Sequence, residues 1–256
     1  MLRVDLAANT SKRTIDCIAE EVPLQITLNN CHSFIIWCSP AQLKELTVGH
    51  LLAEDILQSV DEIEDLIVNQ ANNTCQVTLK ANLNLEERIK NQRKGLRIVS
   101  LIKDSTSAYQ KDDKLSSVQS NLTIKAQIIL DAIGQINEKA RGFKETGGLH
   151  DSAIFEADGT MVAFSEDVGR HNTVDKVIGE GALKKIDFNN CFLIITGRVP
   201  GDMIYKAAKA GLPIVASVAA VLNSGVDSAQ KANITLIGFV RHKHLNIYTH
   251  SQRITL

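Results

Sequence analysis

The residues that could do chemistry gather in three short stretches of the second half of the chain. Each stretch joins glycine to arginine, histidine or acidic residues: positions 146–151, positions 166–176, and the pair Gly197 and Arg198. Glycine lets backbone N–H groups approach a ligand, and a helix N-terminus presents free N–H groups with the positive end of its dipole. Arg170 and Arg198 can each hold a phosphate or carboxylate through two hydrogen bonds. The pattern therefore predicts an anion-binding site.

Each of these residues also has a purely structural interpretation. Glu166, Asp167 and Arg170 could form an ordinary ion-pair cluster on the surface. His150 could be a hydrogen-bonded histidine of the core. The acidic residues, Asp175 among them, could instead orient the arginines or bind the ribose and guanine donors of a nucleotide. We favour a shared ligand site because all three stretches fall at expected junctions between secondary-structure elements.

Other kinds of site find less support. His242 and His244 have a spacing that suits two metal ligands, but no cysteine or carboxylate pair completes the set, so a polar surface loop is favoured there. The sequence has no phosphate-binding loop of the Walker type and no nucleophile-elbow motif. Only 4% of the residues are aromatic and no basic stripe alternates with them, which argues against nucleic-acid binding.

Composition narrows the class of protein further. The chain has 256 residues, of which 44% are hydrophobic and 22% charged, as in globular proteins. With 28 basic and 29 acidic residues the net charge is −1, so any anion site must be local. No segment approaches the roughly 18 apolar residues that a membrane span needs. We therefore expect a cytoplasmic protein, and the scattered cysteines, mostly in strand-like apolar runs, agree: Cys17, Cys31, Cys38, Cys75 and Cys191.

Hydrophobic patterns in the second half predict the sheet that would carry the site. Strands at residues 153–156 and 161–164 flank Asp158 and Gly159, which is a hairpin signal. Asn172 is expected to cap a helix, with Asp175 returning the bond. Buried strands at 191–196, 214–219 and 234–240 alternate with helices at 202–210 and 223–231. This alternation favours a mostly parallel sheet covered by helices, with ligands beyond the carboxyl ends of its strands.

The first half predicts mainly strands and one helix. Candidate strands lie at residues 15–19, 24–28, 34–37, 63–68 and 75–79. Ser39 is expected to cap a helix that has Pro40 as its first residue and continues through Leu51. Residues 82–97 are highly charged and indicate a solvated helix or a connector, and residues 104–121 indicate a polar mobile loop. A helix at residues 125–139 follows.

Four runs of residues resemble one known protein family. They are TGGLHDSAIF at 146–155, EDVGRHNTVDKVIG at 166–179, TGRVPGDMIYKAAKAGLPIVAS at 196–217 and TLIGFVRHKHLNIYTHSQR at 235–253. Together they resemble the formate dehydrogenase accessory sulfurtransferase family, FdhD, most strongly over residues 140–256. The resemblance implies an α/β fold with a cytidine deaminase-like domain at residues 122–256, in which a mixed sheet lies between helices. It also implies a smaller α+β domain at residues 1–121 that ends in the polar loop.

The resemblance further implies a function and partners. Family members accept sulfur from a cysteine desulfurase as a persulfide and pass it to the molybdenum cofactor, as bis(molybdopterin guanine dinucleotide), which formate dehydrogenase receives. GDP-like nucleotides are then expected ligands, and a homodimer is the expected assembly. Zinc is not expected, because no Pro-Cys-x-x-Cys motif follows His150. The residues expected to bind the cofactor are Gly147, Gly148, His150, Glu166, Asp167, Arg170, His171, Asp175, Lys176, Arg198, Phe239, Val240, Arg241, His242, Lys243 and His244.

One departure from the family concerns the sulfur itself. The family carries a C-x-x-C motif in the mobile loop, whereas the corresponding stretch here has Ser105, Ser107 and Gln110 and no cysteine. Only a thiolate has the nucleophilicity that persulfide formation needs. We therefore expect cofactor binding without sulfur transfer through this loop. Two alternatives stay open: a chaperone that docks formate dehydrogenase and does no chemistry, or a nucleotide- or pterin-acting enzyme that uses His150, Asp151 and Asp167.

Overall fold

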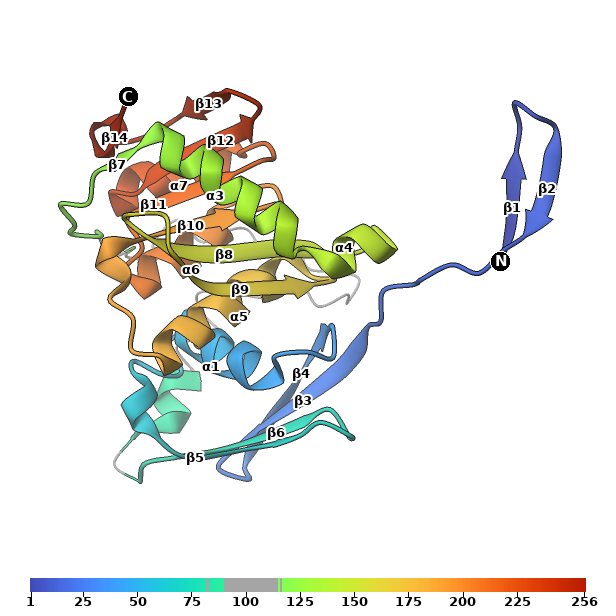
Figure 1. Ribbon diagram of the computed structural model, residues 1–256. Helices are drawn as coiled ribbons and strands as arrows, with labels where there is room; N and C mark the ends of the chain where they lie inside the picture. Colours follow the sequence, from blue (N-terminus) through green and yellow to red (C-terminus); the bar gives the residue numbers. More distant parts are fainter. Residues whose placement is uncertain (82, 90–114, 116) are drawn as a thin grey trace.

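A computed structural model describes residues 1–81, 83–89, 115 and 117–256 of the chain (Figure 1). The positions of Ser105, Ser107 and Gln110 lie outside the described residues, as does much of the charged segment at 82–97. The described chain forms a six-stranded sheet between helices, a four-stranded sheet, and a hairpin that projects from the body (Figure 1). The α/β class expected from the sequence is confirmed.

The larger sheet has the strand order β13-β12-β11-β10-β8-β9. Its strands are β8 (His150–Glu156), β9 (Met161–Asp167), β10 (Cys191–Ile195), β11 (Ile214–Ser217), β12 (Thr235–Arg241) and β13 (His244–Ile247). Strands β10, β11 and β12 are parallel, whereas the pairs β8–β9, β8–β10 and β12–β13 are antiparallel. The expectation of a mostly parallel sheet is therefore wrong. Tight turns join β8 to β9 and β12 to β13, and a tight turn can join only antiparallel strands.

Helices cover both faces of the larger sheet (Figure 1). The helices are α3 (Ala126–Lys139), α4 (Arg141–Thr146), α5 (Arg170–Leu183), α6 (Gly201–Ala210) and α7 (Asn223–Ala232). Short 3-10 turns lie elsewhere: η1 (Val60–Glu62) precedes β5 of the smaller sheet, η2 (Phe188–Asn190) precedes β10, and η3 (Ser251–Arg253) lies near the C-terminus. On the α3 face, Ile129 and Ile136 pack with Phe155 and Phe192. On the other face, α5, α6 and α7 share a second core with residues such as Leu193. Strand β7 (Ile124–Lys125) directly precedes α3 in the chain. It pairs with β14 (Ile254–Thr255), the last strand.

The smaller sheet has the order β4-β3-β6-β5, and α1 covers one of its faces. These elements are β3 (Val22–Leu28), β4 (His32–Cys38), α1 (Leu43–Ala53), β5 (Ile63–Asn69) and β6 (Thr74–Leu79). Leu24 and Ile26 of β3 share a third core with Leu43 and Leu46 of α1. The helix begins later than expected because Gln42 adopts a left-handed conformation, with φ of 53°, that cannot continue a right-handed helix.

The two sheets are joined where α1 crosses α5. A Cβ atom on Gly49 of α1 would overlap the carbonyl oxygen of Asp175, and one on Gly179 of α5 would overlap the carbonyl oxygen of Glu45. Glycine is required at both positions because the two helix backbones touch there. The domain boundary expected between residues 121 and 122 separates α1 from α5, so two such domains would share this close helix contact.

A hairpin of β1 (Leu2–Asp5) and β2 (Thr10–Arg13) stands away from the body (Figure 1). Every residue of both strands is exposed. Residues 15–19, expected to form a strand, have no regular structure and lead from the hairpin toward β3. The alternation of apolar residues that suggested a strand here does not correspond to a buried face, because Ile15 and Ile18 are both exposed.

Candidate functional site

One edge of the larger sheet collects the predicted site residues. The parallel strands β10, β11 and β12 all end at this edge. Strand β8 runs the other way, so His150 at its start pairs with Asp167 at the end of β9, beside the end of β10. Arg198 follows β10, and Arg170 opens α5 just after β9. The structure thus brings the three predicted stretches to the carboxyl ends of the parallel strands, where α/β folds bind ligands.

The carboxylate of Asp167 organises this edge from a fully buried position. Its Oδ2 accepts a hydrogen bond from the Ser39 backbone N–H at 3.0 Å and pairs with Lys176 Nζ at 2.5 Å. Its Oδ1 accepts from the Gly169 backbone N–H and from the Asn172 amide, both at 2.8 Å. These partners satisfy the charge inside the protein. Asp167 and Lys176, both expected to bind the cofactor, have no exposed surface here and instead hold the loop before α5.

Asn172 and Ser39 do not cap helices, contrary to the expectation from local patterns. Helix α5 begins at Arg170, two residues before Asn172. The Asn172 amide donates to the Trp37 carbonyl oxygen at 2.8 Å, and the Ser39 hydroxyl accepts from the Val168 backbone N–H at 3.1 Å. Both side chains thus join the smaller sheet to the loop before α5. Contacts between segments this distant in the chain leave no local sequence signal.

Asp175 is also buried and returns no capping bond. Lys206 Nζ lies 2.6 and 2.7 Å from its two carboxylate oxygens, and His50 Nδ1 lies 3.4 Å away. Burial alone would raise the pKa of Asp175, but Lys206 and His50 outweigh it and hold the pKa below its usual value. Asp175 therefore links α5 to α6 and α1, and it offers no surface to a ligand. Lys206 follows Met203 by three residues and so lies on the same buried face of α6. This spacing could have indicated from the sequence that Lys206 is buried in an ion pair.

Arg170 and Arg198 form the cationic part of the edge, with His150 close to both. Burial, and then the positive charges of Arg170 and Arg198, lower the pKa of His150, so its imidazole is neutral at neutral pH. Arg170 packs its stem on Gly197, where an added Cβ would lie 3.1 Å from the Arg170 Cβ and Cδ. The Arg170 Nε is buried and has no hydrogen-bond partner within the described part of the chain. Two guanidinium groups beside a neutral histidine suit an anionic ligand.

His171 is held by the first turn of α6. Its Nε2 lies 2.8 Å from Asp202 Oδ2, and each side chain is about one third exposed. Burial alone would raise the pKa of Asp202, but the hydrogen bond and the charge of His171 outweigh it and lower the pKa. The pair ties the start of α6 to the start of α5. Two helix N-termini, each the positive end of a dipole, therefore lie at this edge.

Two acidic residues meet on the face of the sheet opposite to His150 and Asp167. Asp151 and Glu166 are directly opposite on β8 and β9. Burial and the neighbouring Glu166 raise the pKa of Asp151 to about 7. Glu166 accepts hydrogen bonds from the backbone N–H groups of Gly142 at 3.1 Å and Phe143 at 2.8 Å. The Glu166 carboxylate, expected to bind the cofactor, is thus used to anchor the first turn of α4.

The two glycines before β8 each have a structural reason. Gly147 ends α4 in the left-handed conformation, with φ of 66°. Gly148 leaves room for Ala19, since an added Cβ would lie 2.9 Å from the Ala19 Cβ. Both glycines are exposed at the sheet edge, so both backbones can approach a ligand there.

The turn after β12 forms a cavity of about 380 Å³ at the same edge. Its lining residues are Phe239, Arg241, His242, His244 and Asn246. The Arg241 guanidinium lies 5.4 Å from the centre of the Phe239 ring. Val240, also expected to bind the cofactor, has its side chain fully buried in the core beneath α3, so that side chain offers no surface to a ligand. Lys243 is exposed at the tip of the turn and does not line the cavity.

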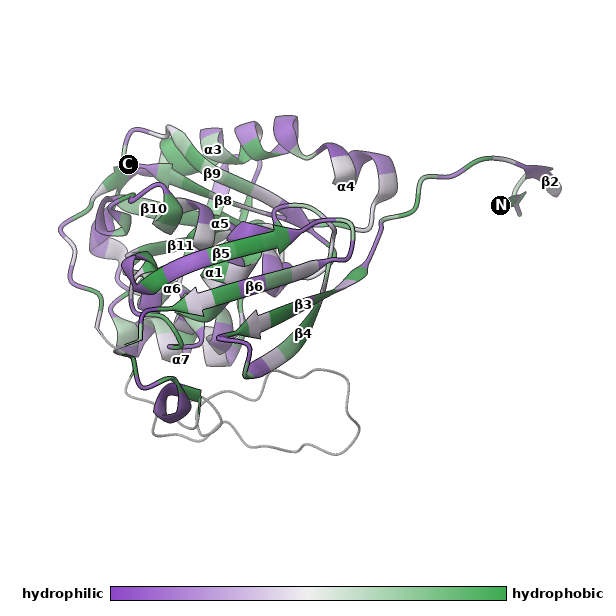
Figure 2. Cartoon of the chain, turned by 90° about the horizontal axis from the view of Figure 1, so that it is seen from below, coloured by the Kyte–Doolittle hydropathy of each residue, from purple (hydrophilic) through white to green (hydrophobic). Residues whose placement is uncertain are grey.

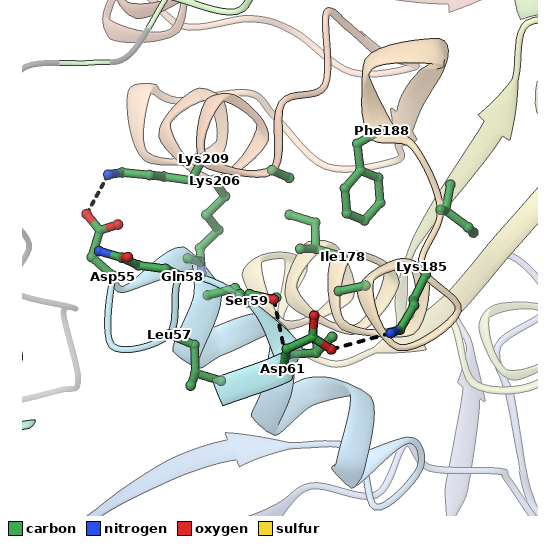
Figure 3. A pocket seen from close by; sticks show the side chains of 16 residues that line it. Asp55, Leu57, Gln58, Ser59, Asp61, Ile178, Lys185, Phe188, Lys206 and Lys209 are labelled. Carbon is green, nitrogen blue, oxygen red and sulfur yellow. Dashed lines mark hydrogen bonds and ion pairs between the residues drawn. The ribbon is translucent and has the colours of Figure 1, made fainter. Parts of the chain in front are cut away.

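A larger cavity, of about 500 Å³, lies near the opposite edge of the sheet, where η2 leads into β10 (Figure 3). Leu52, Ile178 and Phe188 are among its apolar lining. Ion pairs lie along it, Lys209 with Asp55 at 2.5 Å and Lys185 with Asp61 at 3.4 Å. Its lining contains no predicted site residue, so size alone does not make this cavity the functional site.

Across the described residues, no three histidine, cysteine, aspartate or glutamate side chains are grouped so that they could hold a metal ion. Within the same residues, no helix combines the length and apolar character that crossing a membrane requires. The absence of zinc stays a prediction from the sequence.

Known proteins share both the sequence and the fold. Residues 19–255 match the FdhD/NarQ family. Sulfur carrier protein FdhD of Saccharolobus solfataricus is 37% identical over 246 residues, which cover 93% of this chain and 91% of that protein. Proteins of the same name from Methanothermobacter thermautotrophicus (33% identical, 95% and 93% covered) and Staphylococcus haemolyticus (32%, 94% and 91%) are also similar.

The fold has a counterpart among solved structures. A crystal structure described as a candidate formate dehydrogenase accessory protein from Desulfotalea psychrophila superposes with a TM-score of 0.79. It is 21% identical, and the match covers 100% of this chain and 97% of the other. With the family matched over nearly its whole length, the chain belongs to the FdhD/NarQ family.

Proposed function

We propose that this chain is a cytoplasmic accessory protein that binds the molybdenum cofactor, as bis(molybdopterin guanine dinucleotide), and delivers it to a formate dehydrogenase. The observation that carries the proposal is that Arg170 and Arg198 both lie close to His150 at one sheet edge. The buried Arg170 Nε has no hydrogen-bond partner there among the described residues. The names of its relatives, sulfur carrier protein and formate dehydrogenase accessory protein, support this class of function.

The residues of the edge fit the parts of this cargo. The cofactor carries two diphosphates and two guanines. Arg170 and Arg198 offer the paired donors that a diphosphate accepts, and the N-termini of α5 and α6 add their dipoles. The Phe239 ring, with Arg241 beside it, offers an aromatic surface on which a guanine can stack. The molybdenum supplies its redox chemistry in the dehydrogenase, so the residues here bind and orient.

The proposed contacts can therefore be separated from the residues that position them. Asp167, Lys176 and Asp175 are buried in internal ion pairs and position the loop before α5. The proposed contact residues are Gly147, Gly148, His150, Arg170, His171, Arg198, Phe239, Arg241, His242, Lys243 and His244. An enzyme that used Asp167 on a nucleotide or pterin would need its carboxylate at the surface, and the burial of Asp167 disfavours that alternative.

Sulfur transfer is the part of the family's function that this chain supports least. Burial raises the pKa of the thiols of Cys38, Cys75 and Cys191, to about 12 for the first and about 11 for the last. Cys38, Cys75 and Cys191 lie in strands, as expected for most of the cysteines, whereas Cys17 and Cys31 are exposed outside the strands. We propose that the chain carries the cofactor without relaying sulfur through the stretch at residues 103–110. A cysteine desulfurase is then no obligatory partner.

Calorimetric titration of the purified protein with GDP tests the proposal. Saturable binding without turnover of the nucleotide is the expected result. Turnover would identify an enzyme instead. Co-purification with a formate dehydrogenase, combined with no affinity for GDP, would identify a docking chaperone and contradict the proposed cofactor site.

A further inference from the structure

Helix α4 is held in place by hydrogen bonds rather than by packing. None of its residues is buried, and Figure 2 shows it as a mostly hydrophilic turn beyond the end of α3. The Glu166 carboxylate anchors its first turn, because it accepts hydrogen bonds from the backbone N–H groups of Gly142 and Phe143. An element without a buried face depends on such bonds for its position. The place of α4 therefore depends on Glu166.

A chain of hydrogen bonds continues from this anchor to the glycine pair of the site. The Thr146 hydroxyl donates to the Gly142 carbonyl oxygen at 2.7 Å and accepts from the Gly148 backbone N–H at 3.1 Å. Gly147, between Thr146 and Gly148, ends the helix. Both glycines belong to the proposed contacts with the cofactor. A displacement of α4 would therefore move this part of the site.

A second carboxyl group lies beside Glu166. Asp151 is 4% exposed, and its Oδ1 has no hydrogen-bond partner in the described part of the chain. Its backbone is fixed on both sides, by pairing with Glu166 on β9 and by hydrogen bonds with Thr196 after β10. Burial, the charge of Glu166 and a hydrogen bond to Glu166 raise the pKa of Asp151 to about 7. Below that pH, Asp151 keeps a proton that it can donate to Glu166.

The surroundings of Asp151 provide no counter-charge once this proton is lost. Among the charged groups of the described chain, Glu166 is the one that shifts the pKa of Asp151. On the β10 side the neighbouring Thr196 does not titrate at these pH values. The charged side chains at the adjoining ends of α3 and α4 are exposed: Glu138, Lys139, Arg141, Lys144 and Glu145. Two buried carboxylates would then face each other, which is costly without a cation.

We propose that Asp151 and Glu166 are positioning residues for the Gly147–Gly148 backbone: a proton held between the two carboxyl groups keeps α4 on the sheet, and loss of that proton to solvent releases α4 and weakens ligand binding. The release occurs at α4 because β8 is hydrogen-bonded to strands on both of its sides, whereas α4 buries none of its residues. The inference rests on the proposed function, since the two glycines are contacts of the proposed cofactor site.

Calorimetric titration with GDP between about pH 6 and pH 8 tests the effect on binding. Binding by the full chain should weaken by up to about tenfold over this range, the limit for one proton lost near pH 7. Asp151→Asn is uncharged at every pH, so only the ionisation of the GDP phosphate itself should remain. Glu156→Gln is the matched control, because Glu156 is an exposed carboxylate at the other end of β8. It should keep the full dependence.

Hydrogen exchange of the backbone amides of residues 141–148 follows α4 without any ligand. Once corrected for the intrinsic exchange rate, their protection should fall over the same pH range in the full chain and stay constant in Asp151→Asn. Thr146→Val removes the hydroxyl that joins α4 to Gly148. In this variant α4 should still lose protection as the pH rises, while GDP affinity should show no more pH dependence than in Asp151→Asn.

The two measurements separate failure of the inference from failure of the proposed function. A protein that binds no GDP at any pH would contradict the proposed cofactor site, and the exchange data alone would then support or overturn the release of α4. Protection of α4 that does not change with pH would overturn the inference. GDP affinity that changes with pH equally in the full chain and in Asp151→Asn would overturn it as well, and would leave the cofactor site in place.

Discussion

Replacing Arg170 by alanine should weaken GDP binding and leave the fold nearly unchanged. The Arg170 Nε has no hydrogen-bond partner in the described chain, so its removal leaves no internal partner of that atom unsatisfied. The structural loss is the packing of the stem on Gly197. A charge-assisted hydrogen bond contributes about 1.5–3 kcal/mol, which corresponds to roughly 10- to 150-fold weaker binding.

Calorimetry with GDP on full-length variants measures this loss. Arg198→Ala should weaken binding over the same range, because Arg198 lies at the same sheet edge and also acts on His150. Lys185→Ala is the control, since Lys185 is an exposed cation near the opposite edge, 3.4 Å from Asp61. It should bind GDP as the unchanged protein does. Thermal unfolding of each variant checks that the fold is retained.

Three results would refute the reasoning. Unchanged GDP affinity in both arginine variants would remove the anion site from this edge. An equal loss in all three variants, Lys185→Ala included, would show a general effect of net charge rather than a local site. A large fall in the unfolding temperature of Arg170→Ala would instead show that the side chain serves the fold.

Two further predictions rest on the structure and two on the sequence. Because the pKa of Asp151 is raised from 3.8 to about 7, the native protein keeps a proton that the unfolded chain loses, so stability should fall as the pH rises between those values. Asp151→Asn should flatten that fall by up to about 1.4 kcal/mol per pH unit in urea unfolding, and an unaltered slope would contradict the assignment. Gly179→Ala should destabilise the protein by at least about 1–3 kcal/mol, whereas Gly134→Ala, with nothing within 4 Å of the added Cβ, should not. Elemental analysis should find less than one zinc per chain, and one tightly held zinc would overturn the prediction. Incubation with a cysteine desulfurase, cysteine and radiolabelled sulfur should leave the protein unlabelled.

Local patterns predicted most strands of the larger sheet, although not β13, because the signals for turns and helix ends lie within a few residues. Asp158 and Gly159 form the turn between β8 and β9, as expected. Gly211 ends α6 with φ of 85°, the conformation that glycine adopts most readily. Helix α3 occupies almost the predicted residues, since its apolar spacing matches one buried face. The sheet edge that carries the candidate site could therefore be located from the sequence.

The same patterns could not separate ligand contacts from internal ion pairs. Within one run of polar residues, the Arg170 Nε has no partner in the described part of the chain, whereas Asp167 and Lys176 are fully buried in an ion pair. The difference arises because Ser39, distant in the chain, places its backbone against Asp167. Lys206, on another helix, likewise pairs its side chain with Asp175. Burial of a charged residue depends on partners that only the folded chain brings together.

The sulfur prediction separates loss of the relay from its displacement to another thiol. A relay needs an exposed thiolate that can approach both a donor enzyme and the bound cofactor. Cys38, Cys75 and Cys191 fail this test because burial raises the pKa of each thiol. Cys17 is exposed, and it is two residues from Ala19, which lies against Gly148 at the site.

A sulfur relay displaced from the loop would therefore use Cys17. A label abolished by Cys17→Ser but retained in Cys31→Ser would show displacement and contradict the predicted loss. No label in the unchanged protein, together with a label in the double variant Ser107→Cys and Gln110→Cys, would show that only the sulfur atom is missing. Cofactor binding should be equal in both proteins, because the residues proposed to hold the cofactor lie at the sheet edge and include no cysteine.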